Sequence, residues 1–344
     1  MPVFGREQEF ALITSQHFAG QERESMLRSF LIYLSKAAWA QNMVTGWKFA
    51  WRTASRFVAG TKIEDAIRAI KELNAKGINV TLDHLGEHTS KPEEASDATN
   101  EILATLDQIK NSDVRANVSI KLTQIGLGLD ERLCAQNLER IVARARDTGN
   151  FVRVDMEDTP YTDKTINLYC QMRQSGYNNL GMVLQSYLYR SEADARKLLE
   201  DKTPIRLVKG AYQEPADKAF PKKADVDANY DLLTKIMIDA ALAAGSPKIS
   251  DDGRFPPIPA IGTHDPDRIE FAKQYALKVG LPKDAMEFQM LYGIRRDLQE
   301  QLVREGYQVR VYVPFGTHWY PYFMRRLAER PANVWFFISN FFRG

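Results

Sequence analysis

Short apolar runs alternate with amphipathic segments along most of the chain. Eight runs rich in β-branched and apolar residues predict strands, and they begin at Asn79, Val118, Phe151, Leu180, Ile205, Pro259, Met286 and Val309. The segments between them carry apolar residues at three- and four-residue steps, which predicts helices. A strand followed by a helix, eight times over, is typical of a parallel sheet closed into a (β/α)8 TIM-type barrel. An open, doubly wound sheet is the alternative, because the pattern does not show closure.

Local signals mark where the predicted elements begin and end. Asp130, Ser191 and Asp265 are candidate helix N-caps. Residues 1–78 precede the first strand and are predicted to be helical, and the Pro-, Gly- and Asp-rich stretch 245–260 predicts a loop before the sixth strand. We therefore expect an N-terminal helical arm over 1–60 and a barrel domain over 61–344.

Composition narrows the class of protein. With 46 basic and 44 acidic residues the net charge is +2, which argues against a dedicated nucleic-acid binder. Cys134 and Cys170 form no metal or redox motif and are expected to be reduced thiols. The first residues do not resemble a targeting signal, and no run of about 20 apolar residues exists to span a membrane. A cytoplasmic protein is expected.

Polar side chains stand near the ends of the predicted strands. They are Lys121, Asp155, Gln185, Arg206, Lys209, His264 and Tyr312. A charge inside a buried strand is costly unless it is paired or used, and parallel barrels carry their active sites at the carboxyl ends of the strands. The pattern predicts a polar site at one mouth of the barrel. A buried structural network of ion pairs is the alternative.

The last predicted helix adds two adjacent arginines, Arg325 and Arg326, which point about 100° apart on a helix. Guanidinium groups suit carboxylates, so with Lys121 they could hold an anionic substrate. Tyr322 lies three residues before Arg325 and can share its helix face. Taken alone, the same run is explained by surface and core packing.

Together these motifs resemble the proline dehydrogenase family. The matching segments are RFVAG, TLDHLGE, IKL, VDMED, RLVKGAY, GTHD and the terminal YxxRRLAERPAN, in the family's order from about Arg56 onward. The resemblance is to the single-function bacterial enzymes. It implies oxidation of L-proline to Δ1-pyrroline-5-carboxylate, the first step of proline catabolism, by FAD, or FMN, bound inside the barrel. The nearest approach to a GxGxxG fingerprint, at 126–131, fails at its last position.

The resemblance also implies roles for individual residues. Lys121, Arg325 and Arg326 would hold the substrate carboxylate, and Leu291, Tyr312 and Tyr322 would wall the proline pocket. Asp155 would pair with the cations and is treated by the family as functional, with a purely structural carboxylate as the competing interpretation. Arg206 would lie near flavin N5, where negative charge develops on reduction. The other cofactor contacts would be Met156, Gln185, Lys209, Gly210, Ala211, Thr263 and His264.

Two further groups of residues have weaker interpretations. Asp83, His84, Glu87 and His88 resemble a metal-ligand set, but they fall at a strand end and a loop, so no metal is expected. From Ser25 to Gly60 the chain is basic, rich in Trp and free of acidic residues, which is typical of a helix on an anionic membrane surface. Since the family usually passes electrons to a membrane quinone, residues 25–60 could contact the membrane. Packing of this arm on the barrel or on another subunit is the preferred alternative.

Three rival functions remain open on the sequence. Lys209 could form a Schiff base in a barrel lyase, or the flavin could serve a folate reductase. A non-catalytic membrane or protein-interaction module is the third. Bleaching of a flavin spectrum by L-proline, and not by a reduced nicotinamide, would separate all three from a proline dehydrogenase.

Overall fold

The computed structural model describes residue 34 and residues 48–328. Contacts within the chain divide it into two units. The larger is Ala59–Thr317, and the smaller comprises Met1–Val58 and His318–Gly344.

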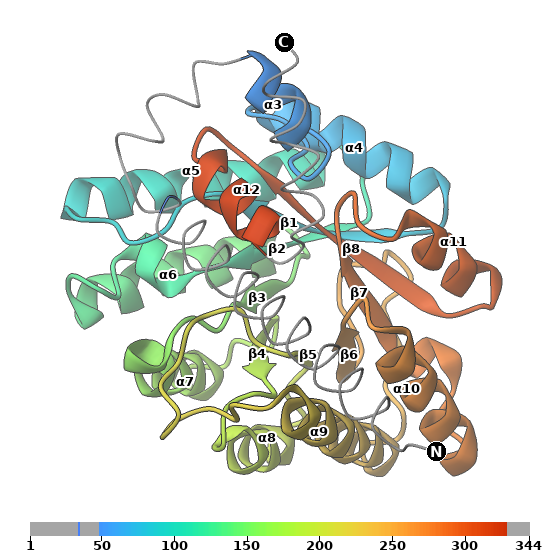
Figure 1. The fold of residues 1–344 in the computed structure, drawn as a ribbon. Helices are drawn as coiled ribbons and strands as arrows, with labels where there is room; N and C mark the ends of the chain where they lie inside the picture. The colour runs from blue at the N-terminus through green and yellow to red at the C-terminus, as the bar shows by residue number, and fades with distance from the viewer. Residues whose placement is uncertain (1–33, 35–47, 329–344) are drawn as a thin grey trace, which may run out of the picture. The chain divides into compact units, whose positions relative to one another are not determined.

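Eight strands form the centre of the larger unit (Figure 1). They are β1 (Asn79–His84), β2 (Ala116–Ile120), β3 (Val152–Val154), β4 (Leu180–Gln185), β5 (Ile205–Val208), β6 (Pro259–Gly262), β7 (Glu287–Leu291) and β8 (Gln308–Phe315). Each strand pairs in parallel with the next, and β8 pairs in parallel with β1. The sheet is therefore a closed barrel, which confirms the TIM-type prediction and excludes the open sheet.

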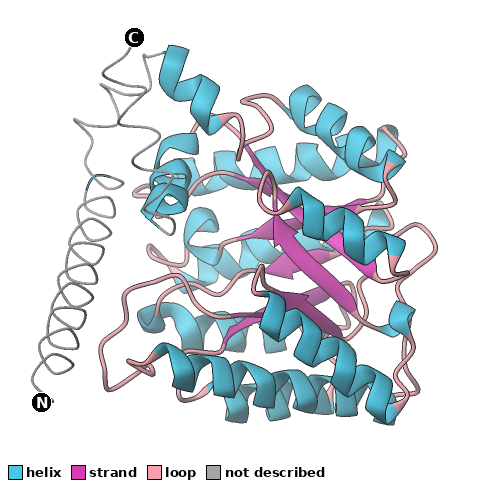
Figure 2. Cartoon of the chain, turned by 45° about the vertical axis from the view of Figure 1, so that its right-hand side comes forward, coloured by secondary structure: helices cyan, strands magenta, loops and turns pink. Residues whose placement is uncertain are grey.

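Helices surround the strands in both views (Figures 1 and 2). They are α4 (Ile63–Ala75), α5 (Pro92–Asn111), α6 (Glu131–Asp147), α7 (Thr159–Gln174), α8 (Ser191–Glu200), α9 (Lys223–Ala243), α10 (Pro266–Val279) and α11 (Arg296–Arg304), with short 3-10 turns η1 (Leu122–Ile125) and η2 (Lys283–Ala285). Their apolar faces explain the packing. In α5, for example, Ala95, Ile102, Leu106 and Ile109 are buried at helical spacing.

Two of the three predicted N-caps are confirmed. Asp130 accepts a hydrogen bond from the Leu133 N–H at 2.7 Å, and Asp265 accepts one from the Asp267 N–H at 3.1 Å. The prediction for Ser191 is wrong by one position, because α8 begins at Ser191 itself. Its hydroxyl donates to the Gln185 carbonyl at the end of β4 and is therefore not available to cap the helix.

The predicted loop before β6 closes the amino end of the barrel. Its Gly253 carbonyl accepts from Arg310 Nη2 at 2.7 Å, and its Arg254 carbonyl accepts from Asn117 Nδ2 at 2.8 Å. Arg310 and Asn117 lie near the starts of β8 and β2. The carboxyl ends of the strands, at the opposite end of the barrel, are thus left for a site.

The smaller unit contains α3 (Lys48–Ala54) and α12 (Trp319–Ala328). The rings of Trp51 and Trp319 meet edge to face at 5.4 Å. Most of the basic segment 25–60 lies outside the described residues, and the division into an arm over 1–60 and a barrel domain over 61–344 stays a prediction. Within the part of the chain that the structure describes, no helix is long and apolar enough to cross a membrane.

Gly253 offers a test of how the loop closes the barrel. Its φ is +68°, and a Cβ there would lie 2.3 Å from Asn79 Oδ1. Gly149 has a similar φ of +64°, but a Cβ there meets nothing within 4 Å. We expect Gly149→Ala to cost about 1 kcal/mol of unfolding free energy for the left-handed backbone alone. Gly253→Ala should cost about 1–3 kcal/mol more, because Asn79 must move. Urea unfolding of both variants measures the difference, and equal costs would contradict a tight fit of this loop.

Candidate active site

Four polar side chains from four strands meet toward the carboxyl end of the barrel. Lys121 and Asp155 directly follow β2 and β3, whereas Arg206 and Tyr312 lie within β5 and β8. Alternate residues of a strand face the same side of a sheet. Closure of the barrel therefore brings these inward-facing residues together from distant parts of the chain.

Asp155 is at the centre of the cluster. Its Oδ1 accepts from Arg206 Nη2 and, at 2.6 Å, from the Ser119 hydroxyl. Its Oδ2 accepts from the Tyr312 hydroxyl at 2.8 Å, and Lys121 Nζ lies 3.7 Å away. Burial alone would raise the pKa of Asp155. The charges of Arg206 and Lys121, with the two hydroxyl donors, lower that pKa overall, so the carboxylate stays ionised.

Lys121 has a second carboxylate partner. Its Nζ lies 3.2 Å from Asp83 Oδ2 and 3.3 Å from Oδ1, and 3.4 Å from the Tyr312 hydroxyl. Burial would lower the pKa of Lys121, but the carboxylates of Asp83 and Asp155 raise it above its ordinary value. Lys121 is therefore a protonated ammonium whose charge is already matched inside the barrel.

Arg206 is fixed on three sides. Besides Asp155, its Nη2 donates to the Ser119 hydroxyl at 3.2 Å, and its Nη1 donates to Gln289 Oε1 at 3.4 Å. The Tyr312 ring lies 5.1 Å from the guanidinium carbon. These contacts use at most three of the five N–H donors that an arginine carries.

The expected cofactor residues lie around the same end of the barrel. Gln185 ends β4, and its Nε2 donates to the Glu157 carbonyl at 2.9 Å. His264 Nε2 accepts from the Leu291 N–H at 2.9 Å, which joins the ends of β6 and β7. Met156 and Thr263, which directly follow Asp155 and Gly262 in the chain, are nearly buried.

Lys209 and Gly210 have structural partners that the sequence did not reveal. Lys209 Nζ contacts the carboxylate of Asp227 and, at 2.6 Å, that of Asp265. An ammonium held by two carboxylates is a poor Schiff-base nucleophile. A Cβ on Gly210, whose φ is +126°, would meet the Tyr187 ring at 2.5 Å, so glycine is required there by the protein itself.

The predicted carboxylate-binding arginines lie in α12 of the smaller unit. Within this helix, the Arg326 guanidinium lies 5.2 Å over the Tyr322 ring. Tyr322 thus stacks with the arginine four residues later, in addition to sharing a face with Arg325. That Arg325 and Arg326 join Lys121 around one anion stays a prediction.

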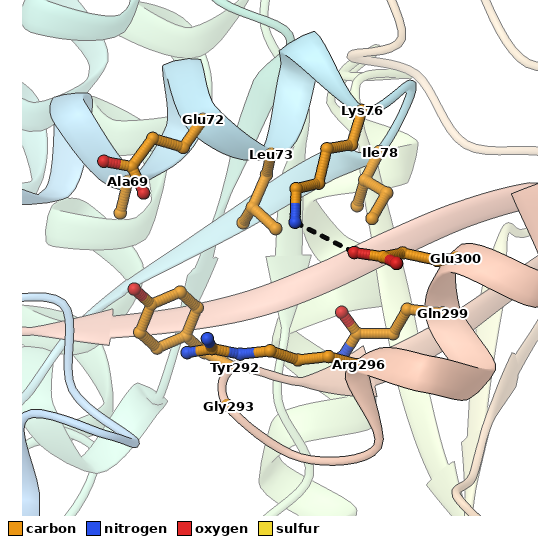
Figure 3. A pocket seen from close by; sticks show the side chains of 10 residues that line it. All are labelled: Ala69, Glu72, Leu73, Lys76, Ile78, Tyr292, Gly293, Arg296, Gln299 and Glu300. Carbon is orange, nitrogen blue, oxygen red and sulfur yellow. Dashed lines mark hydrogen bonds and ion pairs between the residues drawn. The ribbon is translucent and has the colours of Figure 1, made fainter.

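A small cavity elsewhere on the barrel is not a candidate site. It has a volume of about 70 Å³ and lies between α4 and α11, where Lys76 Nζ bonds Glu300 Oε1 at 2.9 Å (Figure 3). Pockets for small molecules usually measure about 300–1,000 Å³. None of the predicted site residues lines it.

Comparison with known proteins identifies the relatives of this arrangement. The family model described as proline dehydrogenase matches residues 66–338. Proline dehydrogenase 1 of Bacillus subtilis (strain 168) is 40% identical over 318 residues, which cover 92% of this chain and 99% of the relative. The proline dehydrogenase of Deinococcus radiodurans is 42% identical over 298 residues, which cover 86% and 91%. The chain belongs to the proline dehydrogenase family.

Solved structures agree on the fold. Proline utilization A from Bdellovibrio bacteriovorus, inactivated by N-propargylglycine, matches with a TM-score of 0.72 and 26% identity over 81% of this chain. A mutant of proline utilization A from Bradyrhizobium japonicum matches with a TM-score of 0.66 and 22% identity. The chain spans 32% and 31% of the length of these two proteins. Family membership confirms the resemblance and removes the Schiff-base lyase and the non-catalytic module.

The candidate site includes four buried polar residues that were not predicted as site residues from the sequence, namely Asp83, Ser119, Glu157 and Gln289. Ser119 and Gln289 lie two residues before predicted site residues, so strand alternation was a signal that could have found them. From the sequence, Asp83 was considered only as part of a metal-like group, whereas in the structure it forms an ion pair with Lys121. Among the described residues, no cluster of His, Cys, Asp and Glu is arranged to hold a metal ion.

Glu157 gives a test of electrostatics beside the site. Its carboxylate accepts from the Thr123 N–H at 3.0 Å and from the Thr123 hydroxyl. Burial raises the pKa of Glu157 to about 7, although both hydrogen bonds oppose the shift. Between pH 4.5 and about 7 the folded protein therefore binds a proton that the unfolded chain has released, and this contribution to stability is lost as the pH rises.

We expect Glu157→Gln to gain stability relative to the wild type as the pH rises through this window. Its amide oxygen can still accept from the Thr123 N–H, and its amide nitrogen can donate to the Thr123 hydroxyl, without a charge. The upper bound of the gain is about 3.5 kcal/mol, at about 1.4 kcal/mol for each unit by which the pKa is raised. Urea unfolding between pH 4.5 and 8 measures it, with Glu139→Gln as a control for the loss of an exposed carboxylate. A constant difference between Glu157→Gln and the wild type would show that Glu157 has an ordinary pKa.

Proposed function

We propose that this protein oxidises L-proline to Δ1-pyrroline-5-carboxylate, the first step of proline catabolism, with a bound flavin as the oxidant. The proposal is supported by membership of the proline dehydrogenase family over residues 66–338. The observation that links the proposed reaction to particular residues is the buried cluster in which Asp155 contacts Lys121, Arg206 and Tyr312.

The residues around the cluster fit a flavin, which we propose to be FAD, with FMN as the alternative. When bound, the flavin would accept a hydride from the substrate carbon beside the nitrogen. Arg206 is a buried cation whose contacts with the described residues use at most three of its five N–H donors, and spare donors are what a group that stabilises developing negative charge requires. The residues that would hold the cofactor are Met156, Gln185, Arg206, Lys209, Gly210, Ala211, Thr263 and His264.

Charge balance explains why substrate binding would need more than Lys121. Inside the barrel, Lys121 and Arg206 face the two carboxylates of Asp83 and Asp155, so this cluster has no positive charge in excess. We propose that Arg325 and Arg326 supply the excess that attracts the proline carboxylate. Leu291, Tyr312 and Tyr322 would then wall the pocket around the ring.

The same excess charge would assist the chemistry. A positive site disfavours a charged ammonium on the substrate, so the amine of bound proline would lose its proton more readily than in water. Hydride departure requires that loss, because the nitrogen lone pair must support the developing C=N bond. Asp155 would act by holding Lys121 and Arg206 in place.

We further propose that electrons leave through a membrane quinone and that the enzyme is cytoplasmic, with residues 25–60 as a peripheral contact at the inner membrane face. The support is the basic, Trp-bearing composition of that segment. Packing of the segment on the barrel or on another subunit is the preferred alternative.

The proposed reaction has a direct test. Purified protein should show a flavin absorption spectrum, and anaerobic addition of L-proline should bleach it because the flavin becomes reduced. A reduced nicotinamide cofactor should leave the spectrum unchanged, which separates this activity from that of a folate reductase. Bleaching by the nicotinamide alone, or a protein purified without flavin that takes none up, would refute the proposal.

A second test concerns the substrate carboxylate. We expect Arg325→Met to raise the KM for L-proline by roughly 10- to 100-fold, which corresponds to the loss of a charged hydrogen bond. The flavin should remain bound, as its absorption spectrum would show. Arg325→Lys keeps the charge but loses the forked geometry, so its KM should be intermediate. Arg304→Met removes an exposed arginine from α11 and is the control. An unchanged KM in Arg325→Met would exclude Arg325 from the carboxylate site.

A further inference from the structure

A line of buried polar groups continues from Arg206 toward the amino end of the barrel. Arg206 Nη1 donates to Gln289 Oε1 at 3.4 Å, and Gln289 Nε2 donates to Glu287 Oε1 at 2.6 Å. Glu287 Oε1 also accepts from Arg310 Nε at 2.8 Å. The side chains of Arg310 and Glu287 are 1% and 0% exposed, so water does not compete for these bonds.

The orientation of the Gln289 amide follows from its neighbours. A guanidinium can only donate hydrogen bonds, and an ionised carboxylate can only accept them. The amide oxygen must therefore face Arg206, and the amide nitrogen must face Glu287. A side chain that accepts at one end and donates at the other meets both demands without adding a third charge.

The lower end of the line is anchored to the backbone. Arg310 Nη1 donates to the Val80 carbonyl at 2.8 Å, and Nη2 donates to the Gly253 carbonyl at 2.7 Å. With its Nε on Glu287, every nitrogen of this guanidinium has a partner. Arg310 thus fixes Glu287, and Glu287 fixes the nitrogen end of the Gln289 amide.

Small residues of β6 allow Arg206 on β5 to reach β7. Ala260 pairs with Arg206 on one side, and Gly262 pairs with Gln289 on the other. A Cβ at Gly262 would lie 3.4 Å from Arg206 Cγ and 2.8 Å from the Leu207 carbonyl oxygen. A larger side chain here would push against the stem of Arg206.

We propose that Gln289 is a positioning residue for the proline dehydrogenase reaction and that it acts through Arg206. Asp155 and Ser119 both hold the guanidinium by Nη2, and contacts on that nitrogen alone allow it to tilt toward Asp155. Gln289 holds the other terminal nitrogen and, together with the Tyr312 ring beside the guanidinium, sets the plane of the group. The inference rests on the proposed function, since it requires that the Arg206 cation stabilise a reduced flavin.

The test compares Gln289→Met with a matched loss of a buried amide outside the barrel. The control is Asn137→Leu on α6, where Nδ2 donates to the Ile125 carbonyl at 3.1 Å. We expect Gln289→Met to lower the rate constant of flavin reduction at saturating L-proline by roughly tenfold, as the loss of one hydrogen bond to a charged group implies. The flavin midpoint potential should become more negative, while the KM for L-proline changes little. Asn137→Leu should change neither the rate constant nor the potential.

Gln289→Glu provides a second variant of nearly the same shape. At low pH its protonated carboxyl can donate to Glu287 and accept from Arg206, so rate and potential should approach those of the wild type. At higher pH the new carboxylate faces Glu287, and the potential should fall more steeply with pH than in the wild type. Among the described residues, the other charged groups toward the barrel interior include Arg206 on β5, Arg310 on β8, Arg153 on β3, Asp155 and Glu157 after β3, Lys121 after β2 and Asp83 on β1.

The outcomes separate this inference from the proposed function. If L-proline does not reduce the wild-type flavin, the proposed function fails. If the wild type is reduced and Arg206→Met shifts the potential, but Gln289→Met and Gln289→Glu leave both potential and rate unchanged, the positioning role is refuted while the function stands. A loss of thermal stability in Gln289→Met without a shift in potential would equally refute it, because a merely structural residue behaves in that way.

Discussion

The buried contact between Asp155 and Arg206 is the interaction on which the candidate site depends. The side chains of Arg206 and Asp155 are only 7% and 11% exposed, so removing either would leave a nearly buried charge without its nearest partner; breaking a buried pair in this way typically costs about 3–5 kcal/mol. The same carboxylate also accepts hydrogen bonds from Ser119 on β2 and Tyr312 on β8, and it lies near Lys121, which follows β2. Barrel closure and this contact therefore support each other, because the strands bring the charges together and the charges hold the strands' inner faces in register.

The balance of charge in this cluster has a consequence for substrate choice. The two carboxylates of Asp83 and Asp155 balance the charges of Lys121 and Arg206. This cluster by itself therefore has no excess positive charge to attract an anionic substrate. The proposed carboxylate site becomes attractive only with cations from elsewhere in the chain, and Arg325 and Arg326 are the proposed source.

The fold was predictable because its signals are local. Each strand and helix carries its own apolar pattern, and eight repeats imply a barrel without knowledge of any contact. Strand-end residues such as Lys121 and Asp155 were found in the same way. Strand alternation could also have found Gln289, but not its bonds to Arg206 and Glu287. The role of Asp83 was missed because its partner, Lys121, lies after a different strand, and the sequence pattern of one strand does not show which residues of other strands it meets. The error at Ser191 has a similar origin, since its hydroxyl bonds a carbonyl six residues back rather than its own helix.

Burying polar and charged side chains inside a barrel carries a desolvation penalty, which suggests that these side chains have a function beyond packing. TIM-type barrels usually pack layers of Val, Ile and Leu inside, and well-packed apolar groups are often as stable as a buried ion pair or more so. Here the inward positions of β7 and β8 instead carry Glu287, Gln289 and Arg310, which hydrogen bonds join to one another, and Tyr312, which donates to Asp155. Apolar contacts fix volume but not orientation, whereas hydrogen bonds fix the direction of each group. If Arg206 faces the cofactor as proposed, the polar core that extends from it to the Gly253 carbonyl would keep its guanidinium in one orientation.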